Sequence, residues 1–128
     1  MSDRKVIYIA APYRSDSIDG IYRNIQRARE AARHYWQEGY AVVCPHLNSA
    51  LMDGSCPDEV FLEGSMELMR RSDIVVFLGQ WYASSGCCKE HDEANRRHMP
   101  IAYEVDGVLP DLEEDACLAE KQCTTLDT

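Results

Sequence analysis

Short apolar runs alternate with longer amphipathic segments along most of this chain. Residues 6–11 form the first run, which is rich in β-branched side chains and is closed by a proline. Residues 40–44 and 74–78 have the same character and end at a proline and a glycine, and residues 101–103 form a fourth short run. Short runs bounded by such residues are typical of strands buried on both faces. The pattern therefore predicts four strands.

The segments between these runs carry helical periodicity. Residues 19–38 have apolar side chains at alternating steps of four and three before Gly39, which predicts a helix that ends at this glycine. The apolar residues concerned are Ile21, Ile25, Ala28, Ala32 and Tyr35. Residues 57–71 predict a second helix with one apolar stripe, and a third begins near Ser84 and is broken by Pro100. Residues 45–58, rich in Asn, Ser, Asp, Gly and Pro, are expected to form a loop.

Strands that alternate with helices imply right-handed βαβ units, which build a parallel sheet covered on both faces. We therefore predict an α/β fold, a flavodoxin-like or Rossmann-like three-layer sandwich with a parallel sheet of four to five strands. At 128 residues the chain has the size of a single domain. We expect this domain to span residues 1–105, followed by an acidic C-terminal tail over residues 106–128.

Charge and cysteine content limit the partners and the compartment. The net charge of −9 argues against nucleic acid or an anionic membrane, because binding a polyanion requires Lys and Arg against its phosphates. No apolar run approaches the roughly 20 residues that cross a bilayer. The N-terminus resembles no signal peptide, so the six cysteines are expected to be reduced and the protein cytoplasmic. A small molecule is the expected partner.

The segment from Ser84 to Glu90 carries the most informative polar residues. It follows the apolar run of residues 74–78, so Glu90 should lie in the first turns of a helix at the carboxyl end of a parallel strand. Ligands of open α/β sheets bind at that edge, where a helix N-terminus adds N–H donors for an anion. The segment thus predicts a sugar or phosphate site. A structural interpretation remains open, since serine is a favoured N-cap and glutamate is favoured in a first helical turn.

Other constellations are less specific. The chain has neither a P-loop nor a Gly-x-Gly-x-x-Gly fingerprint. Arg14 suits a phosphate contact or a solvated loop equally well, and His46 suits a pocket or a capping position. Several thiols and imidazoles fall near predicted strand ends, but their spacing matches no zinc pattern, so we expect neither a metal nor a cofactor. These residues are Cys44, His46, Cys87, Cys88 and His91.

Five segments together resemble the nucleoside 2-deoxyribosyltransferase superfamily, in particular its small bacterial and phage branch. They are Tyr8-Ile-Ala-Ala-Pro-Tyr-Arg14, a first helix with Asn24, Gly39-Tyr-Ala-Val-Val-Cys-Pro-His46, Ser72-Asp-Ile-Val-Val, and Gly79-Gln-Trp-Tyr-Ala-Ser84-Ser-Gly86 with Glu90 and Ala94. The likeness runs over residues 6–103. Its most specific part, Ser84-x-Gly86-x-x-x-Glu90, is similar to the 2′-deoxynucleoside 5′-monophosphate N-glycosidases.

This resemblance implies a reaction and a set of site residues. Glu90 matches the family nucleophile, which attacks the anomeric carbon, releases the base and forms a covalent sugar ester. Tyr8 matches a tyrosine that orients the nucleophile. Arg14 and Ser84 match groups near a 5′-phosphate, and a serine at position 84, in place of the aspartate of the nucleoside transferases, favours a monophosphate. The resemblance also places Tyr13, His46, Ser65 and Gly86 in the binding site.

The chain departs from the family at two positions. The family's proton-handling aspartate corresponds to Ser65, and Glu63 and Glu67 beside it should face other directions on the helix. A glycine that often follows the nucleophile is Asp92, next to His91. We expect Asp73 to be structural and Glu93 to have no chemical role.

The expected activity is cleavage of the base–sugar bond of a nucleoside or deoxynucleoside 5′-monophosphate. The alternatives are a module on the same fold that binds or senses a nucleotide without cleaving it, and a nucleoside deoxyribosyltransferase. Family likeness also implies a homodimer or a larger homo-oligomer. The sequence leaves open the preferred base and the choice between ribose and deoxyribose.

Overall fold

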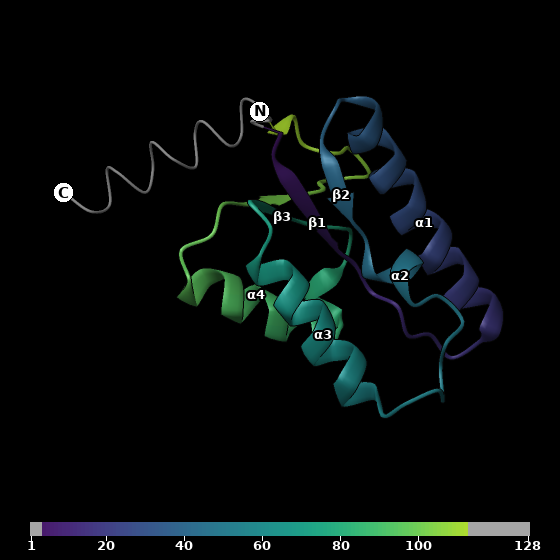
Figure 1. The fold of residues 1–128 in the computed structure, drawn as a ribbon. Helices are drawn as coiled ribbons and strands as arrows, with labels where there is room; N and C mark the ends of the chain where they lie inside the picture. Colours follow the sequence, from purple (N-terminus) through teal and green to yellow (C-terminus); the bar gives the residue numbers. More distant parts are fainter. Residues whose placement is uncertain (1–3, 113–128) are drawn as a thin grey trace.

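The computed structural model describes residues 4–112, and the strands and helices alternate along this part of the chain as the periodicity predicts (Figure 1). Three further helices and a 3-10 turn accompany the long first helix and the four strands. In chain order the elements are β1 (Val6–Ala10), α1 (Ile18–Gln37), β2 (Ala41–Val43), α2 (Pro45–Asn48), α3 (Asp58–Arg70), β3 (Ile74–Phe77), η1 (Trp81–Ala83), α4 (Ser85–Arg96) and β4 (Ile101–Tyr103).

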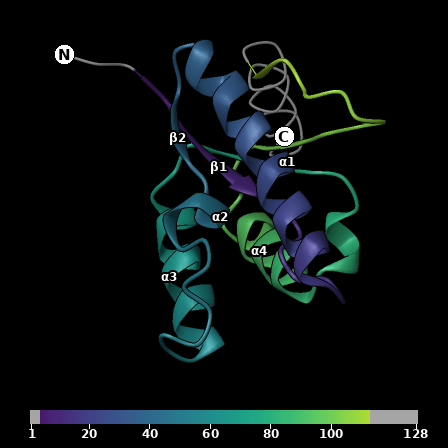
Figure 2. The same ribbon diagram turned by 90° about the vertical axis from the view of Figure 1, so that its right-hand side faces the viewer.

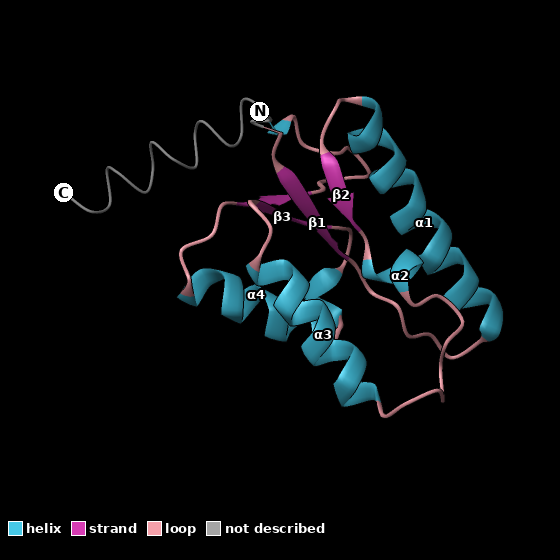
Figure 3. Cartoon of the chain, viewed as in Figure 1, coloured by secondary structure: helices cyan, strands magenta, loops and turns pink. Residues whose placement is uncertain are grey.

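The four strands form one parallel sheet in the order β2-β1-β3-β4. β1 lies in the middle, where Tyr8 pairs with Val43 on one side and Val75 on the other. Helices lie on both sides of these strands (Figure 3). The predicted α/β three-layer fold is confirmed, with four strands in the described part.

Alternate residues of the central strands face two separate cores, since successive side chains of a strand point to opposite faces. Ile7 and Ile9 pack with α1, which lies in front of the sheet in Figure 2. Tyr8 and Ala10 pack on the other face, where α3 contributes Met69 and α4 contributes Ala94. Every strand residue named here is almost fully buried.

Two short elements, α2 and η1, were not predicted from the sequence. The predicted loop of residues 45–58 begins with α2, because Pro45 occupies the first helical position, where its fixed φ suits a helix and its missing N–H is not needed. The 3-10 turn η1 lies between β3 and α4. Helix α4 ends at Arg96, ahead of Pro100, and His98 follows with a φ of 57°. The helix therefore ends four residues before Pro100 and is not broken by the proline itself.

The ordered core continues past residue 105. The Tyr35 hydroxyl donates a hydrogen bond to the Pro110 carbonyl at 2.8 Å, and Leu112 is fully buried in the core on the α1 side. Residues 106–112, which we assigned to the acidic tail, thus pack against the domain. The remainder of the predicted tail, residues 113–128, lies outside the described residues.

Candidate active site

Helix α4 begins where the serine-rich segment predicts. Ser84 is the N-cap, and its Oγ accepts a hydrogen bond from the Cys87 backbone N–H at 3.3 Å. The buried residues of the helix are Cys87, Glu90 and Ala94, whose spacing of three and four places them on one face toward the sheet. Glu90 is therefore carried into the interior one turn beyond the capped end, and only 7% of its surface is exposed.

Tyr8 of β1 is the hydrogen-bond partner of Glu90. Its phenol donates to Glu90 Oε2, and the contact joins residues that lie 82 positions apart in the chain. Tyr8 itself is fully buried on the face of the sheet that α3 and α4 cover. The structure thus brings together the two residues that the resemblance assigns to catalysis.

Burial dominates the proton equilibria of this pair. It raises the pKa of Glu90 to about 7, and the hydrogen bond from Tyr8 opposes part of that rise. Burial, followed by the charge of Glu90, also raises the pKa of Tyr8 well above its ordinary value. A carboxyl group whose pKa is near neutrality exists in both protonation states at physiological pH, which is typical of functional sites.

Cys87 and Ser65 complete the immediate surroundings of the pair. Burial and the nearby Glu90 charge raise the pKa of the Cys87 thiol to about 12, so the thiol stays protonated. The Ser65 hydroxyl of α3 hydrogen-bonds to the Tyr8 phenol. Ser65 therefore lies in the site, as the resemblance implies. Sequence reasoning gave Cys87 no role there, although its spacing of three from Glu90 places it on the same helix face.

Arg14 is engaged with carboxylates from the loop before α3 and the start of that helix. Its Nη2 contacts Asp58 Oδ2 at 2.6 Å and its Nη1 lies 3.7 Å from Asp53 Oδ2. The Tyr13 hydroxyl donates to Asp53 as well, at 2.7 Å. The Arg14 side chain is 64% exposed, and ion pairs in such surroundings are worth only about 0–1 kcal/mol. An incoming anion can therefore exchange with them.

His46 connects the ends of β1 and β2. Its Nε2 lies 2.9 Å from the Pro12 carbonyl, to which it donates, and its ring packs edge-on against Tyr13. Burial lowers the pKa of His46, so the imidazole is neutral at physiological pH. His46 thus orders the loop that carries Tyr13 and Arg14.

Gly86 leaves space beside the capped end of α4. A Cβ built at Gly86 would meet only Leu62 Cδ1 at 3.8 Å and Ser84 Oγ at 3.9 Å, which are ordinary contact distances. The fold at this point does not require glycine.

His91 faces an aromatic cluster beside the site. Its ring stacks on Trp81 with centroids 4.2 Å apart, and its Nε2 lies 2.7 Å from the Tyr103 hydroxyl. Its Nδ1 lies 3.1 Å from the Asn95 amide nitrogen, which donates to it. Both ring nitrogens are therefore occupied away from Glu90. The sequence offered one signal for this cluster, the aromatic residues that end β3 and β4 and begin η1.

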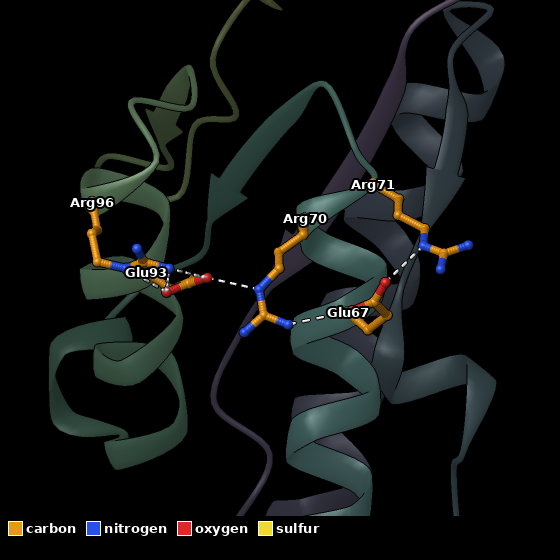
Figure 4. Close-up of polar contacts among 5 residues, drawn as sticks. All are labelled: Glu67, Arg70, Arg71, Glu93 and Arg96. Carbon is orange, nitrogen blue, oxygen red and sulfur yellow. Dashed lines mark hydrogen bonds and ion pairs between the residues drawn. The ribbon is translucent and has the colours of Figure 1, made fainter.

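Glu93, for which we expect no chemical role, joins helices α3 and α4 through ion pairs (Figure 4). Its carboxylate contacts Arg70 Nε at 2.7 Å and Arg96 Nη2 at 2.9 Å, and its side chain is only 12% exposed. Arg70 also pairs with Glu67, which contacts Arg71. Asp73, by contrast, is structural as expected: it accepts a hydrogen bond from the Val6 N–H at the start of β1.

Other features of residues 4–112 do not extend the site. No group of three or more His, Cys, Asp or Glu side chains in this range converges enough to hold a metal ion. No helix in the same range is both long and apolar enough to cross a membrane. A shallow groove of about 480 Å³ lies along α1 and α2, on the opposite side of the sheet from Glu90. Its lining includes Arg29, Trp36 and Leu47.

The fold and the buried pair define a small α/β protein in which a glutamate on helix α4 is hydrogen-bonded to a tyrosine on the central strand. Residues 5–104 match the family described as a domain of unknown function (DUF7768), and the chain belongs to that family. The match includes every residue assigned to the site above. No curated protein matches this chain.

Proposed function

We propose that this protein is an N-glycosidase that cleaves the base–sugar bond of a nucleoside 5′-monophosphate. The observation that supports the proposal most directly is the buried hydrogen bond between Tyr8 and Glu90. It holds a carboxylate in one orientation, and the pKa of about 7 keeps a substantial fraction of it ionised at neutral pH. A fixed, partly desolvated carboxylate is suited to nucleophilic attack on an oxocarbenium-like carbon.

In this mechanism an Oε atom of Glu90 attacks the anomeric carbon while the bond to the base nitrogen breaks. The base keeps the electron pair of that bond, and a base that is neutral in the nucleotide takes up one proton from solvent as it leaves. The product is a sugar ester of Glu90. Water then attacks the same carbon, the carboxylate leaves and one proton is released to solvent. Tyr8 orients the attacking oxygen through its hydrogen bond to the other carboxylate oxygen. Transfer to a second base instead of water would make the enzyme a deoxyribosyltransferase.

The 5′-phosphate in this proposal lies between Ser84, the α4 N-terminus and Arg14. A helix N-terminus favours an anion, and a guanidinium–phosphate contact is worth about 1.5–3 kcal/mol. The phosphate has to replace Asp58 on Arg14, which the exposed ion pair permits. We also propose that the protein acts as a homodimer, as the family resemblance implies, and that it acts in the cytoplasm, as the N-terminal sequence and the cysteines led us to expect.

The test is the appearance of free base. Purified protein is incubated with a panel of ribo- and deoxyribonucleoside 5′-monophosphates, and the products are separated by chromatography. Free base formed by wild type but not by Glu90→Gln would support the mechanism. A requirement for added second base would identify the transferase. Absence of any product with the complete panel would contradict the proposal.

Two variants test the choice of a monophosphate. Arg14→Ala should weaken turnover of the monophosphate much more than turnover of the unphosphorylated nucleoside. Ser84→Asp places a carboxylate beside the phosphate, so monophosphate affinity in calorimetry should fall while nucleoside affinity holds. Equal effects on both ligands would show that these residues serve only the fold.

The position of Ser65 favours a second candidate, a module that binds a nucleotide without cleaving it. A hydroxyl replaces the carboxylate that handles protons in the family the chain resembles, and it is hydrogen-bonded to Tyr8. Calorimetric binding of a monophosphate without release of base would support this alternative.

A further inference from the structure

The groups around Glu90 indicate which base can leave. Tyr8 already donates its proton to Glu90, Ser65 hydrogen-bonds to Tyr8, and Cys87 is a buried thiol with a raised pKa. These come from β1, α3 and α4, the elements packed around the carboxylate. The nearby His91 has both nitrogens occupied, and Glu93 is paired with two arginines. In the described structure the Tyr8 phenol and the Cys87 thiol thus lie near Glu90, and the Ser65 hydroxyl lies beside the phenol.

Such a site supplies a nucleophile more readily than a proton. Cleavage of a neutral base requires a proton on the departing base, and a general acid that supplies it contributes about 10²–10⁴ in rate. An efficient acid has a pKa near the working pH, whereas the Cys87 thiol has a pKa of about 12 and the Tyr8 phenol a pKa well above its ordinary value. The pKa of Glu90 is about 7, but as the nucleophile its carboxyl group must be ionised.

We infer that the preferred substrate is a nucleoside 5′-monophosphate whose base carries a permanent positive charge, such as an N-ribosyl pyridinium or an N7-alkylated purine. This inference rests on the proposed function and narrows its substrate class. When the bond between sugar and base breaks, its electron pair neutralises the positive nitrogen and the base leaves without a proton. The ester on Glu90 is then hydrolysed, so the products are the free base, the sugar phosphate and one proton.

Electrostatics agree with this substrate. A cationic base beside the Glu90 carboxylate is attracted in the bound state, and its positive charge offsets part of the repulsion between the substrate phosphate and a protein of net charge −9. The phosphate remains the one anionic group that the protein must hold locally.

A matched pair of substrates tests the inference. Guanosine 5′-monophosphate and its N7-methyl cation differ by one methyl group, and both are used with ribose and with deoxyribose. Spontaneous release of base is measured with Glu90→Gln and subtracted. We expect kcat/KM for the cation to exceed that for the neutral nucleotide at least about a hundredfold. A ratio below tenfold, with both substrates cleaved, would overturn the inference and leave the N-glycosidase proposal intact. Cleavage of neither would overturn both.

A preference for the cationic nucleotide could come from the lack of a general acid in the site or from the greater intrinsic reactivity of the cation. Ser65→Asp distinguishes these two causes. The new carboxylate stands where the resembling family has its proton-handling group, so turnover of the neutral nucleotide should rise at least about tenfold and the ratio between the two substrates should narrow. Ser65→Ala is the matched control for loss of the hydroxyl. Circular dichroism confirms the fold of each variant. A folded Ser65→Asp protein that keeps the wild-type ratio would contradict the inference.

Discussion

The two faces of the central strand β1 differ in the kind of contacts they make. Ile7 and Ile9 face α1 and pack in an apolar core, whereas Tyr8, between them, faces α3 and α4 and hydrogen-bonds to Glu90. All three strand residues are fully buried. The apolar face stabilises the fold through burial alone. The other face keeps a carboxyl group out of water, which costs stability and is expected where chemistry requires it.

The difference predicts that variants on one face change stability and variants on the other change chemistry. Every buried side-chain nitrogen and oxygen within residues 4–112 has a hydrogen-bond partner. Removal of one polar side chain from the Glu90 face therefore leaves its former partner without that hydrogen bond, whereas removal of an apolar side chain from the α1 face leaves only a cavity.

The largest effect is expected for Glu90→Gln. This substitution keeps the shape of the side chain and removes the nucleophile, so turnover should fall at least roughly a hundredfold while the fold remains. Release of free base is the measurement. The matched control is Glu63→Gln, an exposed carboxylate on α3. A wild-type rate in Glu90→Gln would end the proposed mechanism.

On the apolar face, Ile9→Ala should lower the free energy of unfolding by about 2–4 kcal/mol, because it removes buried methyl groups and leaves a cavity. Urea unfolding followed by circular dichroism measures this loss. The pH dependence of turnover by the folded variant should match wild type. A change in that dependence would show that the two faces are coupled.

The pH dependence of stability should identify the buried carboxyl group. The pKa of Glu90 is raised in the folded state, so its contribution is fully present below the ordinary carboxyl pKa of 4.5 and is lost as the pH rises through about 7. Ionisation of the buried Glu90 carboxyl group above that pH lowers the free energy of unfolding by about 3 kcal/mol. Glu90→Gln should therefore unfold at a higher temperature than wild type above neutral pH. Equal melting temperatures there would show that Glu90 is solvated.

Tyr8→Phe should shift a pH profile more than it changes stability. The ring still fills the core, but Glu90 loses the hydrogen bond that lowers its pKa, so the rising limb of turnover should move to higher pH. Turnover measured over a range of pH tests this shift. An unchanged limb with a lower plateau would assign Tyr8 to orientation alone.

The smallest effect is expected for Glu93→Gln. It weakens the contacts with Arg70 and Arg96, so the melting temperature at neutral pH should fall by a few degrees. Both arginines lower the pKa of Glu93, so its contribution is present above the ordinary carboxyl pKa and is lost as the pH falls through the lowered value. The melting temperatures of Glu93→Gln and wild type should therefore differ at neutral pH and converge at acidic pH. Turnover by the folded variant should be unaffected.

The strands and the three longer helices follow from local pattern, and their ends lie within one or two residues of the predicted positions, apart from the end of α4. Residues 74–78 predicted β3, and Gly39 was correctly identified as the residue beyond α1, where its φ of 97° is unfavourable for other side chains. The short helix α2 was missed because four residues carry no helical periodicity. The partners of Arg14, Asp53 and Asp58, were missed because no sequence spacing connects them.

What the sequence by itself determined is the set of elements, their order and the helix that presents Glu90, because hydrophobic period and capping residues act over a few neighbouring positions. The family resemblance implied that Tyr8 and Ser65 belong to the site of Glu90. Only the tertiary structure decided that the Tyr8 hydroxyl reaches Glu90 across 82 residues, that the Cys87 thiol lies near the pair, and that Glu93 joins two helices. The physical reason is that burial and hydrogen bonding set the pKa of a carboxyl group, and both are properties of packed neighbours.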